Sequence, residues 1–332
     1  MAHTMNINFL IFMGFALIFQ FIMGANDGGT LLGSIVSSNF IRPIFAVVIL
    51  FIGMFLAPFI FGTAIVKTLG TKILPLEYMN MQLLYGTIIS TIIWVIIAQK
   101  IKYPVSISYA FVGALIGGGI ATKFANKINR PEVYKIFGAL IISILISFAA
   151  GFLLIKLINL LLHKATTRTS MYFKILQVFT SVSLVMGYGA NDAEKTLSLI
   201  YMAAYVTHTN IAANAKDPWI ILALAAIFIV GTLLFGENVA TTAGFRIMRS
   251  KPKQTFFAQL ITSVTVLSFA RIGLPISSTE TLNMGLIGTG TGEKPYSVRW
   301  NVVKNLLFVW IITIPASILL SYVITLILEK MF

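Results

Sequence analysis

The tetrapeptide Gly-Ala-Asn-Asp occurs twice, at Gly24–Asp27 and, 165 residues later, at Gly189–Asp192. Each copy lies at the end of an uncharged apolar stretch, where a carboxylate is costly and usually marks an ion path or a functional pair. Asparagine followed by aspartate places two oxygen-bearing side chains next to each other, and hard cations prefer oxygen ligands. The predicted cation ligands are Asn26, Asp27, Asn191 and Asp192.

A second repeated motif carries hydroxyl groups. Pro104–Ser108 (Pro-Val-Ser-Ile-Ser) is matched by Pro275–Thr279 (Pro-Ile-Ser-Ser-Thr), and each precedes a glycine-rich apolar stretch with helical character. Proline suits the first turn of a helix, serine and threonine cap its free N–H groups, and a helix amino terminus attracts anions. Hydroxyls can donate hydrogen bonds to an oxyanion without adding charge. The predicted anion-binding hydroxyl residues are Ser106, Ser108, Ser277, Ser278 and Thr279.

Together these motifs would bring several negative charges close to one another. Two aspartates and a divalent oxyanion would place about four negative charges in one low-dielectric cavity, where each repulsion costs several kcal/mol. Cations or protons must therefore accompany the anion. Glu280 directly follows the second hydroxyl motif and adds a carboxylate. It must be protonated, bind a cation or point away, and we favour a cation or proton role.

These residues must be positioned by membrane helices. Of the 332 residues, 58% are hydrophobic and only 10% are charged, whereas an ordinary soluble domain has about 25% charged residues. A membrane-spanning helix needs roughly 20 apolar residues. Uncharged runs of that order are residues 8–26, 44–66, 79–99, 103–122, 136–155, 175–191, 218–236, 254–270 and 305–328. We predict an all-α polytopic membrane protein with roughly 10–12 membrane segments, some of them discontinuous or re-entrant.

The motifs recur in the same order, which indicates an internal duplication. Leu115-Ile116-Gly117, for example, returns as Leu286-Ile287-Gly288 after the second hydroxyl motif. We predict a first repeat over residues 1–162, a central connection over residues 163–171 and a second repeat over residues 172–332.

Charge predicts how the two halves are oriented. The amino terminus has no positive charge, which favours the outside, and the basic central connection favours the inside. An odd number of crossings per half makes the repeats inverted, the usual plan of secondary transporters. The basic stretch Lys123–Lys135 does not fit, because it lies outside if residues 136–155 form a single crossing into the central connection.

Over roughly residues 8–328 the chain resembles the PiT family of inorganic phosphate transporters, most closely its shorter bacterial members. The resemblance rests on Gly24–Asp27, Pro104–Ser106, Gly189–Lys195, Pro275–Ser277 and the segment from Val298 to Ala316. It implies inverted repeats, phosphate carried with sodium ions or protons, no other cofactor, and a homodimer. It places sodium at Asp27 and Asp192 and the hydroxyls on phosphate, with Asn26 and Asn191 counted among both sets of ligands.

The chain departs from the family pattern at several positions, among them Met186-Gly187-Tyr188, where many bacterial members have Ser-His. The family usually reads Pro-Val-Ser-Thr-Thr-His in both halves, whereas here Tyr109 and Glu280 stand at the histidine positions and Ile107 replaces a threonine. These departures bear on the substrate and the coupling ion, and some members of the family carry sulfate.

The leading hypothesis is a multi-pass secondary transporter of the cell membrane that carries inorganic phosphate with sodium or protons. A permease for sulfate or another tetrahedral oxyanion is the alternative, followed by an anion channel with a fixed filter. We expect no catalytic residues, because neither His-Glu-x-x-His nor Gly-x-Ser-x-Gly occurs. The chain has no cysteine, which excludes disulfides and thiolate metal sites. The net charge of +14 lies mostly in short connections, as in cytoplasmic loops, so nucleic acid is not an expected partner.

Overall fold

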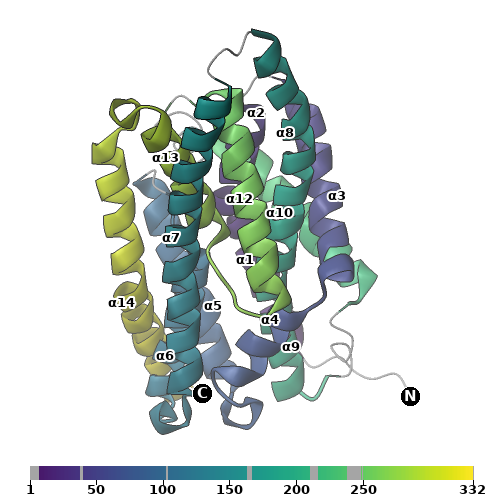
Figure 1. Cartoon of the computed structure of the whole chain (residues 1–332). Helices are drawn as coiled ribbons and strands as arrows, with labels where there is room; N and C mark the ends of the chain where they lie inside the picture. The colour runs from purple at the N-terminus through teal and green to yellow at the C-terminus, as the bar shows by residue number, and fades with distance from the viewer. Residues whose placement is uncertain are drawn as a thin grey trace.

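The computed structural model describes residues 7–37, 40–101, 104–162, 167–209, 216–237, 248 and 250–331, and every regular element in these ranges is helical. The first half contains α1 (Ile7–Met23), η1 (Gly24–Gly28), α2 (Gly29–Val36), α3 (Pro43–Phe61), α4 (Ala64–Lys67), η2 (Thr68–Lys72), η3 (Leu76–Tyr78), α5 (Met81–Lys100), α6 (Ile107–Ala121), η4 (Ala125–Lys127) and α7 (Arg130–Leu161). The second half contains α8 (Thr167–Tyr188), η5 (Gly189–Ala193), α9 (Glu194–Val206), α10 (Pro218–Phe235), α12 (Pro252–Arg271), α13 (Ser278–Glu293), η8 (Pro295–Ser297) and α14 (Trp300–Met331). Most of the helices run along one common direction in a single bundle (Figure 1), so the predicted all-α fold is confirmed.

The bundle has the dimensions and surface of a membrane protein. Within the described ranges, seven helical stretches are long and apolar enough to cross a bilayer. α6 is a shorter apolar helix, and the more polar α12 and α13 lie in the same bundle. Large apolar side chains such as Ile141, Leu145 and Phe308 are exposed on the outside of the bundle, as a lipid-facing surface requires. The chain is therefore a multi-pass membrane protein.

Both Gly-Ala-Asn-Asp motifs lie in single π-helical turns, η1 and η5, inside otherwise continuous helices. Such turns occur frequently at functional sites. The helices continue through both motifs. The glycines of the first copy admit α10. A Cβ atom at Gly24 would lie 2.0 Å from the Phe228 carbonyl oxygen, and one at Gly29 would lie 2.5 Å from that of Gly236.

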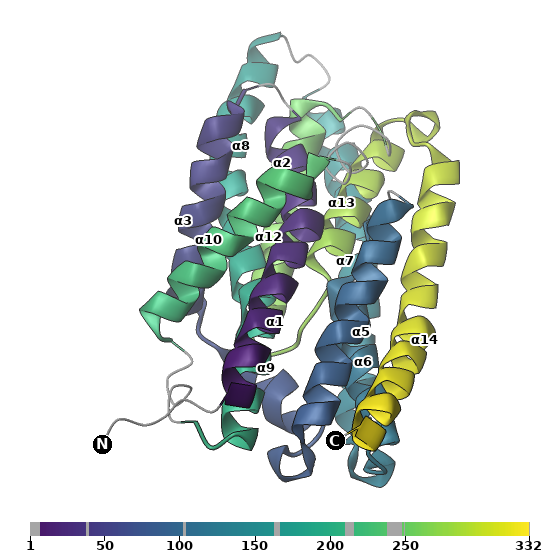
Figure 2. The ribbon, with the colours of Figure 1, turned by 180° about the vertical axis from the view of Figure 1, so that it is seen from behind.

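Each hydroxyl motif lies between the two helices of a helical hairpin, α5 and α6 in the first half and α12 and α13 in the second. The first hairpin enters from the lower end of the bundle, where α5 begins and α6 ends. The second enters from the upper end, where α12 begins and α13 ends (Figures 1 and 2). In each hairpin the chain is non-helical just before the second helix, and Ser106 or Ser277 is its N-cap. The predicted serine caps are therefore present. The prolines, Pro104 and Pro275, precede the caps rather than occupying the first helical turn.

Each hairpin packs against the final helix of the other half. α6 lies along α14, and α13 lies along α7, which are both 32 residues long. Glycines allow these contacts, because a Cβ atom at Gly117 would lie 2.2 Å from the Ile318 carbonyl oxygen. At the equivalent Gly288, an added Cβ atom would lie 2.2 Å from the Phe148 carbonyl oxygen. The two halves are therefore interlocked rather than placed next to each other as separate units.

Gly288→Ala is expected to destabilise the protein by about 1–3 kcal/mol, because the added methyl group overpacks the α13–α7 contact. The measurement is the apparent melting temperature of the purified protein in detergent. Gly138→Ala is the matched control, since Gly138 lies in α7 and a Cβ atom there meets nothing within 4 Å. An equal melting temperature in both variants would contradict the proposed close packing.

The two halves run in opposite directions. α7 rises from the lower to the upper end of the bundle, whereas α14 descends (Figures 1 and 2). α1 begins at the lower end and α8 at the upper end. Lys123–Lys135 lies at the same end as the start of α1, as expected if α7 is a single crossing. α8 begins at Thr167, inside the range predicted as the central connection, and residues 163–166 lie outside the described residues.

Candidate functional site

The asparagine of each Gly-Ala-Asn-Asp motif binds the backbone of the hydroxyl motif from the same half. The Asn26 amide donates to the Val105 carbonyl oxygen at 2.8 Å and accepts from the Val105 N–H at 3.2 Å. Asn191 makes the same pair of bonds with Ile276, at 2.8 and 3.1 Å. These bonds satisfy the backbone of a non-helical segment in the membrane interior, where an unpaired group is costly. Both amides thus hold the hydroxyl motifs in place, and their predicted contacts with phosphate or a cation stay predictions.

Hydroxyls near the start of α13 reach both aspartates. Thr279 donates to Asp27 Oδ1 at 2.7 Å, across the boundary between the two halves. Its neighbour Ser278 contacts Asp192 Oδ1 at 3.4 Å and accepts from Asn191 at 2.8 Å. Since adjacent residues contact Asp27 and Asp192, the two carboxylates lie close together. All four side chains are buried.

The remaining hydroxyls lie at the same junction. Ser108 donates to the Ile276 carbonyl oxygen at 2.6 Å, so α6 also contacts the opposite half. Ser106 accepts from the Tyr109 N–H at 3.2 Å, and Ser277 accepts from the Glu280 N–H at 3.4 Å. As caps, Ser106 and Ser277 use their oxygens as acceptors, and each hydroxyl keeps a hydrogen that can be donated. The Ser106 hydroxyl lies beside the Glu280 carboxyl group. These two serines are therefore the best placed of the five hydroxyl residues to bind an oxyanion.

Glu280 is the most unusual carboxylate of the site. It is fully buried, and neither carboxylate oxygen has a hydrogen-bond partner among the described residues. It directly follows Thr279, which binds Asp27. A buried carboxylate without partners is costly, and a bound cation or proton would remove that cost. The sequence-based prediction of a cation or proton role for Glu280 is compatible with this position.

Two charged residues at the start of α9, Glu194 and Lys195, were not among the predicted ligands. Glu194 Oε2 accepts from the backbone N–H groups of Ile65 and Val66, at 2.8 and 3.2 Å, and thereby fixes the start of α4 in the other half. Lys195 is buried and pairs with Asp192 Oδ1. A lysine three residues after an aspartate on a helix predicts such an ion pair, so the signal was present in the sequence.

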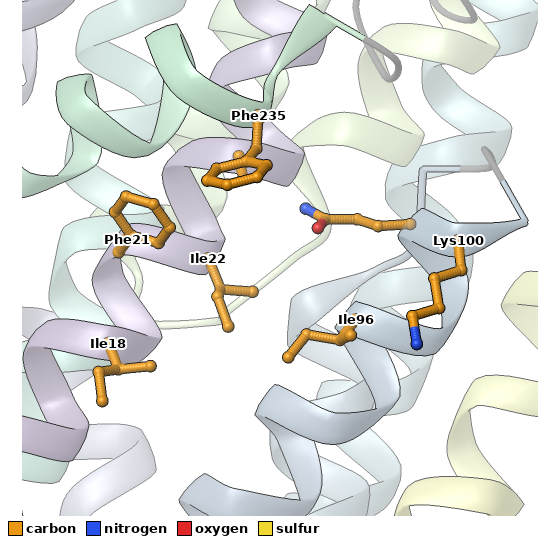
Figure 3. A pocket seen from close by; sticks show the side chains of 8 residues that line it. Ile18, Phe21, Ile22, Ile96, Lys100 and Phe235 are labelled. Atoms are coloured by element: carbon orange, nitrogen blue, oxygen red, sulfur yellow. The ribbon is translucent and has the colours of Figure 1, made fainter.

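A cavity of about 580 Å³ lies next to this site but is not part of it. Figure 3 shows its walls, to which α1 contributes Ile18, Phe21 and Ile22, α5 contributes Ile96 and Lys100, and α10 contributes Phe235. Ala25 also lines it, one residue before Asn26, but none of the predicted ligands does. Its mostly apolar walls suit an acyl chain better than a phosphate ion. The predicted anion site is instead the buried junction of the two hairpins.

The junction can bind ions of both signs. Two helix amino termini, those of α6 and α13, lie next to three buried carboxylates, those of Asp27, Asp192 and Glu280. Hydroxyls and N–H groups can hold an oxyanion, and the carboxylates can hold cations that balance its charge. Both halves contribute groups to this junction.

Known proteins share this sequence and architecture. The sequence profile of the phosphate transporter family matches residues 23–170 and 162–321. A probable low-affinity inorganic phosphate transporter of Rhizobium meliloti (strain 1021) is 31% identical over 309 residues, covering 92% of either chain. A protein of the same description from Bacillus subtilis (strain 168) is 29% identical over 321 residues, covering 96% of either chain.

A solved structure, described as the sodium-dependent phosphate transporter, has the same fold. It superposes with a TM-score of 0.87 over 98% of this chain and 100% of that chain, at 21% identity. The matched relatives are named as transporters rather than enzymes, which agrees with the expectation that this protein is not an enzyme. From the family profile and these relatives, the chain belongs to the phosphate transporter family.

Proposed function

We propose that this transporter carries inorganic phosphate across the cell membrane by symport with sodium ions or protons. One observation supports the proposal most strongly. Ser278 and Thr279, adjacent at the amino terminus of α13, contact Asp192 and Asp27 respectively. An anion-binding helix terminus and two candidate cation ligands therefore meet in one buried site formed by both halves.

Charge balance supports coupling. Phosphate bound beside Asp27, Asp192 and Glu280 would repel them strongly at low dielectric. Cations bound together with phosphate would neutralise the site and allow the loaded transporter to move its binding site from one face of the membrane to the other. Sodium is supported by the structural relative, which is described as sodium-dependent, and protons are the alternative coupling ion.

We further propose that the two halves are inverted repeats that exchange access to the site. The matching π-helical turns, the hairpins from opposite ends and the opposed directions of α7 and α14 support this proposal. In transporters of this plan, one repeat moves against the other around a central site. The family resemblance also implies a homodimer, and the mass of the purified protein in detergent tests that part of the proposal.

Ser106→Ala and Ser277→Ala are each expected to raise the phosphate concentration for half-maximal uptake by about 10- to 100-fold. Each variant removes one charge-assisted hydrogen bond, worth about 1.5–3 kcal/mol. Both variants also lose a helix cap, so Asn129→Ala serves as the control. Asn129 caps α7 by accepting from the Glu132 N–H, away from the site. Unchanged phosphate affinity in both serine variants would place the substrate elsewhere.

Uptake into proteoliposomes tests the identity of the substrate. Labelled phosphate and labelled sulfate are offered separately, each with an imposed sodium gradient and, in a second series, an imposed proton gradient. We expect saturable phosphate uptake under one of the gradients, with little inhibition by excess sulfate. Saturable sulfate uptake without phosphate uptake would replace the proposed function by that of a sulfate permease.

A further inference from the structure

The two Gly-Ala-Asn-Asp motifs differ at the third residue after the aspartate. The first motif has Thr30 at this position, and the second has Lys195, 165 residues later. Both residues follow a π-helical turn and both are buried. Thr30 bonds to the helix itself, with its hydroxyl 3.3 Å from the Asn26 carbonyl oxygen. Lys195 instead places a positive charge in the site.

The Lys195 ammonium group is bound to Asp192. Its Nζ donates to Asp192 Oδ1, and both side chains are at most 2% exposed. Among the described residues, Lys195 is the only buried lysine or arginine. The pair is therefore a specific feature of the core of the transporter and not one of the many basic residues in its loops.

Asp27 forms no ion pair of its own, and the Lys195 charge acts on it only from beyond hydrogen-bonding distance. Its Oδ1 atom accepts from Asn26 and Thr279, and both of these donors are neutral. Glu280, next to Thr279, adds a second carboxyl group, whose oxygens have no hydrogen-bond partner within 3.5 Å in the described part of the chain. The repeat by itself predicts two equivalent cation sites, but only the one at Asp27 has a carboxylate that lacks a positive partner.

We infer that the Lys195 ammonium group replaces a coupling cation at Asp192, so that each phosphate is carried with one cation fewer than two equivalent aspartates would bind. This inference rests on the proposed symport. It also revises the expectation of sodium at Asp192. A tethered ammonium neutralises the carboxylate through every transport cycle but is never released, so it contributes no driving force.

The number of coupling cations can be measured at equilibrium. Proteoliposomes are held at zero membrane potential with equal potassium and valinomycin. With sodium gradients the internal and external pH are equal, and with proton gradients the accumulation ratio is taken for a single protonation state of phosphate. The logarithm of the internal-to-external phosphate ratio is plotted against the logarithm of the external-to-internal cation ratio. The slope of this plot is the number of cations carried with each phosphate. Sodium gradients are used, or proton gradients if these drive the parent protein.

Lys195→Thr, which copies Thr30 of the first half, is expected to raise the slope by one, because Asp192 then needs a mobile cation. Lys195→Arg keeps the charge and should keep the parent slope. The double variant Asp192→Asn/Lys195→Thr removes both charges and should also return to the parent slope. A slope unchanged in Lys195→Thr, with phosphate uptake intact, overturns the inference and leaves the proposed symport standing.

A binding measurement covers the case in which Lys195→Thr does not transport. The melting temperature of the detergent-purified protein is followed against sodium chloride, with choline chloride as control, or against pH. We expect Lys195→Thr to gain stabilisation by the coupling cation beyond that of the parent. Equal stabilisation in both proteins would contradict the inference. If the parent itself takes up phosphate under neither gradient, the proposed symport fails, and the inference fails with it.

Discussion

Asp27→Asn is expected to abolish gradient-driven phosphate uptake, lowering the initial rate by about 100-fold or more. Asp27 is the buried carboxylate of the repeated motif without a positively charged partner, so it is the best candidate ligand for the coupling cation. Loss of a charge-assisted interaction costs about 1.5–3 kcal/mol per bond, and each 1.4 kcal/mol is a factor of ten. The fold should survive, because the asparagine can still accept from Asn26 and Thr279.

Asp217→Asn is the matched control for this variant. Asp217 is a carboxylate at the N-cap of α10, where it accepts from the N–H groups of Trp219 and Ile220. Asparagine caps a helix as well as aspartate does, so this variant removes a negative charge without disturbing the helix. Near-normal cation-driven uptake by Asp27→Asn would mean that Asp27 does not bind the coupling cation.

Glu280→Gln is expected to raise the cation concentration for half-maximal uptake by about 10- to 150-fold, which corresponds to the loss of one charged interaction. Glu280 is fully buried and its oxygens have no hydrogen-bond partners among the described residues, so a cation is the group best able to compensate its charge. High cation concentration should restore part of the uptake. Initial rates measured over a range of cation concentrations give the shift.

A permanently protonated Glu280 would behave differently. Glutamine closely matches a protonated glutamate in size and charge, so a cation dependence identical to that of the parent would assign Glu280 a neutral structural role. Glu77→Gln is the control, because Glu77 is an exposed carboxylate in η3, outside the long helices.

Much of the site was predictable because the chain is duplicated. A single Asn-Asp pair or Pro-x-Ser motif says little, but matched copies in the same order identified Asp27, Asp192 and the capping serines. The structure joins them in one hydrogen-bonded cluster, with Thr279 bound to Asp27 and Ser278 to Asp192. The multi-pass helical fold followed from the low charge content alone.

Other features depend on contacts that no local pattern encodes. Gly24 and Gly29, for example, admit α10 from the other half because they have no side chains. The amides of Asn26 and Asn191 bind the backbone of Val105 and Ile276, 79 and 85 residues away along the chain. Such partners become known only when the hairpins are in place.

The most direct test of the account is whether a cation gradient concentrates phosphate. Proteoliposomes containing the protein are given an inward sodium or proton gradient, and internal labelled phosphate is followed over time. Symport predicts that internal phosphate rises above the external concentration and falls back when a sodium ionophore or a protonophore dissipates the gradient. Phosphate that only equilibrates across the membrane, at the same level with and without either gradient, would contradict symport and indicate a channel or uniporter.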